Sequence, residues 1–178
     1  MSFRRFAKAA IEKTAAYRLL GSSLSGLATI FVLHRVIRDD ESVLDSAVAV
    51  NERFLNAAVS HVINRGYEIV SLEELCSRLN SRSHGRHMVV FTFDDGYRDN
   101  GLIASKVFER HRVPWSLYLT TGFPDRTCSY WWGALEEVLR VRDVFEIEMR
   151  RFHRKFEVRS IAEKRAAFEL INRNWPPI

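Results

Sequence analysis

The fold of this chain is indicated by one stretch of sequence, Met88-Val89-Val90-Phe91-Thr92-Phe93-Asp94-Asp95-Gly96-Tyr97-Arg98-Asp99-Asn100. Its β-branched and aromatic start is typical of a strand buried on both faces. Because successive strand side chains point to opposite faces, Asp94 and Asp95 can share a pocket only where the strand ends, and Gly96 lets the chain turn there. Asp99 is predicted to cap a helix that begins near Asn100. A strand, two acids at its carboxyl end and a helix form the arrangement in which α/β folds place catalytic residues.

The segments around this stretch predict alternating strands and helices. Further strands are predicted at 29–36, 67–70 and 114–121, the first of them buried. The intervening helices carry two apolar stripes: Phe54, Leu55, Ala58, Val59, Val62 and Ile63; and Leu102, Ile103, Val107 and Phe108. Ser71 with Glu74 and Ser160 with Glu163 predict capped helices, and residues 144–158 alternate with the period of a strand hairpin. Strands separated by helices favour a parallel sheet.

Asp-Asp-Gly alone is also common in plain turns. The complete string from Thr92 to Tyr97, followed by Arg-Asp-Asn, resembles the first signature of the NodB-like polysaccharide deacetylases, carbohydrate esterase family 4. The resemblance continues upstream in Phe-Val-Leu-His-Arg-Val at 31–36, which is similar to the family's first barrel strand. It continues downstream over 113–123 and covers residues 28 to 140 in all.

This resemblance implies an α/β fold in the form of a partial, distorted (β/α) barrel. A complete barrel of the family has roughly seven or eight βα units, so four predicted strands make about half of one. The implied domain organisation is an N-terminal helix and linker over 1–27, followed by a truncated NodB homology domain over 28–178.

The resemblance also implies roles for individual residues. Carried over by position, Asp94 is the catalytic base and Asp95 is a metal ligand, with the backbone N–H of Tyr97 near the oxyanion. The implied cofactor is a divalent metal, zinc as first choice, which lowers the pKa of a bound water to about 7. His34, at the end of the predicted first strand, is expected either to form a wall of the substrate pocket or to be a hydrogen-bonded structural residue.

An aromatic cluster follows the last predicted strand of the sheet. Trp131 and the apolar residues after it recur at helical spacing, which places part of this cluster in the core. An exposed member is expected to stack on a sugar ring of a carbohydrate substrate, either Trp132 or Tyr130.

The chain departs from the family pattern in its histidines. The family supplies two further ligands from a downstream His-[Ser/Thr]-x-x-His motif, whereas only His111 and His153 follow Asp95 here. His84 and His87 precede the motif strand, roughly 20 Å from the acids at ~3.3 Å per residue, and are expected to be solvated. A zinc site usually has about three protein ligands.

Two functions therefore stay open. The first is a hydrolase of N-acetyl groups on a polysaccharide or chitooligosaccharide, truncated and weak or inactive as this chain alone. The alternative is a non-catalytic carbohydrate-binding or partner-binding remnant of the fold. In either case the strand at 115–121 would lie at an open sheet edge, available for pairing.

Composition excludes few further classes. The formal charge of +5 is spread along the chain, and no nucleic-acid-binding motif is present, so no nucleic-acid partner is expected. The apolar segment at 19–33 is shorter than the ~20 residues of a membrane span. Residues 2–19 predict an amphipathic helix, either packed under the first strand or resting on a membrane. Cys76, predicted to be buried, and Cys128 form no disulfide framework, so a cytoplasmic location is expected.

Overall fold

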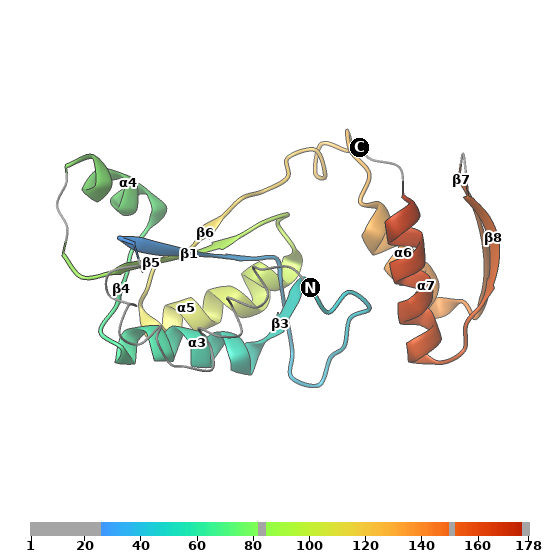
Figure 1. Ribbon diagram of the computed structural model, residues 1–178, viewed down its shortest axis with the longest axis horizontal. Helices are drawn as coiled ribbons and strands as arrows, with labels where there is room; N and C mark the ends of the chain where they lie inside the picture. Colours follow the sequence, from blue (N-terminus) through green and yellow to red (C-terminus); the bar gives the residue numbers. More distant parts are fainter. Residues whose placement is uncertain (1–25, 82–84, 150–151, 176–178) are drawn as a thin grey trace, which may run out of the picture.

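The computed structural model describes residues 26–81, 85–149 and 152–175. The predicted helix at 2–19 and His84 lie outside these residues. Figure 1 shows two lobes: a sheet with helices, here called the sheet lobe (26–123), and a helix pair beside a hairpin, here called the C-terminal lobe (131–175). Among the helices that the structure describes, none is long and apolar enough to cross a membrane.

Strand β5, Met88–Phe93, lies at the centre of the sheet lobe, and all six of its residues are buried. Strand β1, Ala28–Leu33, pairs with one edge of β5 along its full length. The other edge is shared by β4, Glu68–Ile69, at the start of β5 and by β6, Ser116–Leu117, at its end. All these pairs are parallel, which confirms the predicted parallel sheet and places the carboxyl ends of the strands together.

Helices cover both faces of this sheet (Figure 1). Helices α3, Glu52–Asn64, and α5, Ser105–His111, lie on one face, and α4, Leu72–Asn80, lies on the other. The alternation of β5 side chains divides the core accordingly. Val89, Phe91 and Phe93 pack with α3 and α5, whereas Met88 and Val90 pack with Leu75 of α4.

The predicted buried strand at 29–36 is wrong in two respects. The segment breaks at His34, and β2, Arg35–Ile37, pairs with β3, Ala49–Asn51, in a separate parallel pair. The exposed large apolar side chains of β1 are Ile30, Phe31 and Val32. β1 pairs only with β5 in the described chain, so an apolar run suited to a central strand forms an edge here, with side chains exposed on both faces.

The helix after the motif also differs from the prediction. It starts with a π-helical segment, η1, Asn100–Ala104, and continues as α5. Asp99 already has helical backbone angles and makes no side-chain cap. Val107 and Phe108 are buried as predicted, but Leu102 is exposed, because the wider π turn shifts the register of the helical stripe.

Three smaller predictions about the sheet lobe are also wrong. Strand β6 is much shorter than the predicted strand at 114–121. Phe54 and Ile63 of α3 are exposed, although Leu55, Val59 and Val62 of the same stripe are buried. Cys76 is exposed, because only Leu75 of α4 is buried against the sheet.

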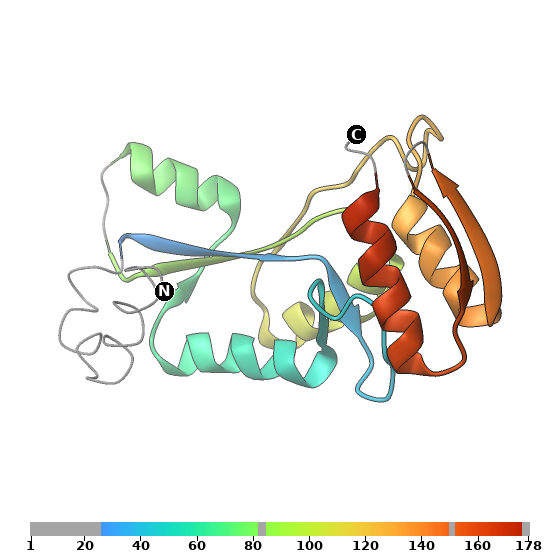
Figure 2. The ribbon, with the colours of Figure 1, turned by 45° about the vertical axis from the view of Figure 1, so that its right-hand side comes forward.

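The C-terminal lobe contains α6, Trp131–Val141, the antiparallel strands β7, Val144–Met149, and β8, Phe152–Glu157, and α7, Ile161–Asn174. The predicted hairpin and the capping box of Ser160 and Glu163 are both confirmed. Figure 2 shows the two helices side by side against the hairpin. They enclose a second core, which contains Leu135, Leu139, Phe156, Phe168 and Ile171.

Candidate functional site

The two acids lie on a tight turn at the end of β5. Asp94 still belongs to the sheet, since its N–H donates to the carbonyl of Leu33 at 2.9 Å. Asp95 and Gly96 then both have left-handed backbones, with φ of 71° and 76°. Aspartate tolerates this region better than most residues, and glycine enters it freely. The turn places both carboxylates beside a cavity of about 430 Å³ that Tyr118 and Leu119 also line.

Asp95 lines a second cavity, of about 270 Å³, together with His34, Tyr97 and Trp132. This is here called the His34–Asp95 cavity. The Nδ1 atom of His34 lies 3.5 Å from Oδ2 of Asp95, and within the described residues it makes no hydrogen bond although it is buried. The structure thus gathers four of the five residues predicted for the site around one cavity, and Asp94 lines only the neighbouring one.

The end of the motif holds His34 in place. Asn100 is fully buried, and its Nδ2 donates to the backbone carbonyl of His34 at 2.8 Å. Asp99 accepts the N–H of Val36 at 3.0 Å, so the chain is held on both sides of Arg35. Sequence reasoning assigned Asp99 to a helix cap, because a contact with a residue 63 positions earlier leaves no local pattern.

Arg35 connects the motif to the C-terminal lobe, and sequence reasoning missed it. Its Nε donates to Oδ2 of Asp99 at 3.3 Å, and its Nη1 donates to Oε2 of Glu136 at 3.0 Å. Its guanidinium lies 5.1 Å from the ring centre of Tyr97, within range of a cation–π interaction. Glu136 also accepts the N–H of Leu44 at 2.8 Å. The only local signal was a basic residue directly after His34, which is too common to be diagnostic.

Burial and ion pairing act against each other in this network. Burial acts to lower the pKa of Arg35, but Glu136 and Asp99 outweigh it, so the pKa is raised. Burial raises the pKa of Asp99, and the N–H of Val36 and the charge of Arg35 oppose this effect. Arg35 is therefore a permanent cation between two carboxylates.

Aromatic rings form the other side of the cavity. Nε1 of Trp132 donates to the Tyr97 hydroxyl at 2.7 Å. Burial raises the pKa of Tyr97, and the bond from Trp132 opposes the rise, so the phenol is neutral at pH 7. Trp132 packs edge-on against Tyr130 and Phe123, at centroid distances of 5.0 and 5.8 Å. Trp132 is thus held within the cluster, whereas Tyr130 is 39 % exposed.

The donor atoms around Asp95 fit part of a metal centre. Two ligands of one tetrahedral zinc ion, each at ~2.0–2.1 Å from it, lie roughly 3.3 Å apart, which is close to the spacing of His34 Nδ1 and Asp95 Oδ2. Residues 26–81, 85–149 and 152–175 contain no group of three or more His, Cys, Asp or Glu side chains that could hold a metal. His111 contacts Asn56, and His153 contacts Glu146. These residues alone do not complete a zinc site.

No protein-family model and no curated protein matches the chain. Among solved structures, it is similar to the deacetylase PplD of Streptococcus pyogenes in complex with acetate, with 17% identity and a TM-score of 0.44 over 57% of this chain and 45% of that one. It is similar to a de-N-acetylase from Aggregatibacter actinomycetemcomitans, with 14% identity and a TM-score of 0.47 over 82% and 51% of the two chains. It is also similar to a polysaccharide deacetylase from Bacillus cereus, with 18% identity and a TM-score of 0.42 over 52% of this chain and 29% of that one. The chain spans about half or less of each of these proteins, and all three are deacetylases by name.

Proposed function

We propose that this chain is part of a metal-dependent polysaccharide deacetylase, and that on its own it removes N-acetyl groups weakly or not at all. The observation that carries this proposal is the turn at the end of β5. Left-handed backbones at Asp95 and Gly96 place two adjacent carboxylates at the carboxyl end of a parallel strand, beside His34. Strained backbone of this kind is concentrated at functional sites.

The proposed roles follow the motif. Asp94 is the general base, Asp95 is a metal ligand, and the backbone N–H of Tyr97 faces the oxyanion. His34 and Trp132 form walls of the substrate cavity. A divalent metal, zinc as first choice, requires further ligands from outside the described residues, because Asp95, even with His34 as a second ligand, supplies at most two of the usual three or so.

The rest of the site would come from a partner that extends the sheet toward a barrel. Strand β6 and the two residues after it offer an edge for such pairing, since Leu117, Tyr118 and Leu119 are exposed and β6 pairs only with β5 in the described chain. Unpaired strand edges favour the addition of further strands.

A second candidate is a non-catalytic remnant that binds carbohydrate or a protein partner. The incomplete donor set favours it for this chain alone. The aromatic and charged lining of the His34–Asp95 cavity would then serve binding without hydrolysis.

The test combines zinc calorimetry, elemental analysis and acetate release from chitotetraose with the purified 178-residue chain. We expect weak zinc binding that is lost in Asp95→Ala and kept in Asp125→Ala, an exposed loop acid outside the cavities. Oligosaccharide binding without zinc binding would favour the remnant. A chain that binds no zinc and no oligosaccharide would contradict the proposal. Rapid turnover would contradict the expected weakness of the isolated chain.

A further inference from the structure

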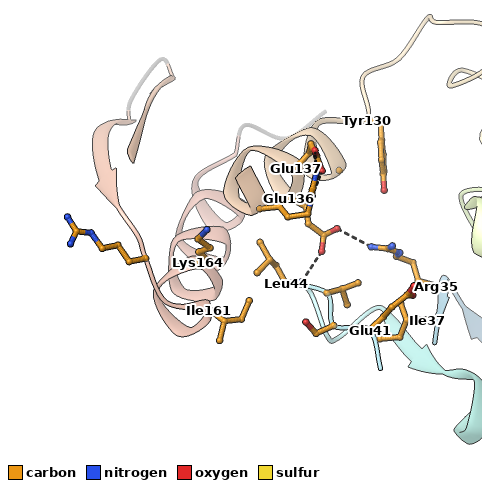
Figure 3. Close-up of a pocket in the computed structure, with 14 residues that line it drawn as sticks. Arg35, Ile37, Glu41, Leu44, Tyr130, Glu136, Glu137, Ile161 and Lys164 are labelled. Atoms are coloured by element: carbon orange, nitrogen blue, oxygen red, sulfur yellow. Dashed lines mark hydrogen bonds and ion pairs between the residues drawn. The ribbon is translucent and has the colours of Figure 1, made fainter. Parts of the chain in front are cut away.

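A larger cavity adjoins the His34–Asp95 cavity between the two lobes. It has a volume of about 770 Å³ and shares Arg35 and Glu136 with its neighbour. Figure 3 shows the residues that line it. The segment 41–44 lines one side, and the C-terminal lobe lines the other. Ligand sites typically have volumes of about 300–1,000 Å³. The larger cavity falls within this range, whereas the His34–Asp95 cavity is just below it.

Tyr130 is built into the wall of this larger cavity. A Cβ atom on Gly133 would lie 1.8 Å from Cε1 of Tyr130 and 2.2 Å from its Cζ, so only glycine lets the ring approach the first turn of α6. Edge contacts with Trp132 and Phe123, at centroid distances of 5.0 and 5.5 Å, hold the ring from other directions. In Figure 3 the ring is seen edge-on, with its hydroxyl toward Arg35 and one face toward the cavity.

The polar lining of this cavity is nearly balanced in charge. It contains four basic side chains, Arg35, Arg140, Arg159 and Lys164, and three acidic ones, Glu41, Glu136 and Glu137. Three of the four basic groups already have carboxylate partners, in the pairs Arg35–Glu136, Arg140–Glu137 and Lys164–Asp143.

Paired charges of this kind present hydrogen-bond donors and acceptors without a strong net field. That combination suits a neutral, polyhydroxylated ligand better than a phosphate or a polyanion. A sugar ring also has an apolar C–H face, which matches a fixed aromatic ring, and hydroxyl groups at its rim, which match the paired charges.

We propose that Tyr130, seated on Gly133, is the platform of a second sugar subsite, so that the ligand is an oligosaccharide of at least two units rather than a single sugar. This inference rests on the proposed function and deepens it. Trp132, which its hydrogen bond to Tyr97 holds inside the cluster, then shapes the His34–Asp95 cavity. Tyr130 makes the stacking contact in the adjoining larger cavity.

The test is the dependence of affinity on ligand length. Calorimetry with the full chain compares chitotetraose with N-acetylglucosamine, and we expect the tetramer to bind at least about tenfold more tightly. Tyr130→Ala removes the platform, and Gly133→Ala displaces it without removing any functional group. Both are expected to bring the tetramer's affinity close to that of the monomer, so the ratio of the two affinities is the quantity compared between variants. Tyr130→Phe keeps the ring and is expected to keep the preference.

The outcomes separate this inference from the proposed function. An undiminished preference for the tetramer in Tyr130→Ala would overturn the second subsite and leave the deacetylase proposal standing. Binding of neither sugar by the wild-type chain would count against both. If inorganic phosphate displaced the tetramer at a concentration similar to that of the tetramer, the inference that the larger cavity takes a neutral ligand would be overturned. Because Gly133→Ala can disturb α6, circular dichroism accompanies it, and Tyr130→Ala gives an independent result.

Discussion

Arg35 and Glu136 are 101 positions apart in the chain, and Nη1 of the arginine donates to Oε2 of the glutamate at 3.0 Å. The pair joins β2 of the sheet lobe to α6 of the C-terminal lobe, and both cavities of the proposed site contain it. The two side chains are only 22 % and 25 % exposed, so water screens the pair less than a surface ion pair. Arg35 therefore helps to hold the aromatic cluster near the Asp94–Asp95 turn, together with the hydrogen bonds from Leu44 to Glu136 and from Trp132 to Tyr97.

Replacing this arginine tests that dependence. Arg35→Gln leaves Asp99 and Glu136 without their cationic partner, and we expect the free energy of unfolding to fall by about 2 kcal/mol, the scale of hydrogen bonds to charged groups. Urea unfolding measures the change. The matched control is Arg140→Gln, whose side chain is 69 % exposed in its pair with Glu137 and whose loss is expected to cost less than about 1 kcal/mol. Equal losses in the two variants would contradict a special role for Arg35.

The parts of the fold that the sequence predicts are those determined by local pattern. Strand β5, the hairpin and the capped final helix follow from alternation and capping residues within about ten positions of one another. The exposure of β1 does not follow from local pattern. Ile30, Phe31 and Val32 have the composition of a central strand, and only the strand pairing decides that they form an edge.

The candidate site divides in the same way. Asp94, Asp95 and Gly96 stand out in the sequence because the turn needs those residue types together. Arg35 and Glu136 could not be found, since their meeting depends on how the two lobes pack. The choice between Trp132 and Tyr130 stayed open for a related reason: exposure within an aromatic cluster is a tertiary property.

Asn100 is expected to contribute to stability through its bond to His34. Asn100 is fully buried, and Asn100→Ala removes its donor to the partly buried bond with the His34 carbonyl, so we expect a loss of about 2 kcal/mol. Asn174 is a matched control, because its Nδ2 also donates to a backbone carbonyl, that of Leu170, but in an exposed position. Asn174→Ala is expected to cost less than about 0.5 kcal/mol. Chemical denaturation measures the unfolding free energy of both variants, and the NMR signal of the His34 ring is a second readout. If Asn100→Ala changed neither the unfolding free energy nor the His34 signal, the positioning role would be contradicted.

The capping box of α7 predicts a pH-dependent contribution to stability. Hydrogen bonds from the backbone of Ser160 and Arg159 lower the pKa of Glu163 from 4.5 to about 2. Because the folded-state pKa is the lower one, the stabilisation is complete above pH 4.5 and is lost as the pH falls toward about 2. The difference in unfolding free energy between wild type and Glu163→Gln should therefore shrink over this range. Ala162→Gln changes no titratable group and should give a difference that does not vary with pH.

The turn at Gly96 gives a test of the backbone strain beside the two acids. Gly96→Ala places a side chain on a residue with φ of 76°, and we expect a loss of about 1–2 kcal/mol in unfolding free energy. The new Cβ would also lie 2.3 Å from Cδ1 of Leu119, but that atom ends a flexible side chain and can move. Gly101→Ala is the control, because no atom lies within 4 Å of its added Cβ, and alanine in a helical segment is expected to stabilise by about 0.5–1 kcal/mol.

A third variant separates conformational strain from crowding at this turn. Gly96→Asn adds the same Cβ and a larger side chain, yet asparagine enters the left-handed region more readily than alanine. If the backbone conformation of the Asp94–Asp95 turn sets the cost, Gly96→Asn should be more stable than Gly96→Ala in thermal or urea unfolding. If crowding against Leu119 sets the cost, the order should reverse, and the turn would then be held by packing rather than by a conformation that glycine alone adopts freely.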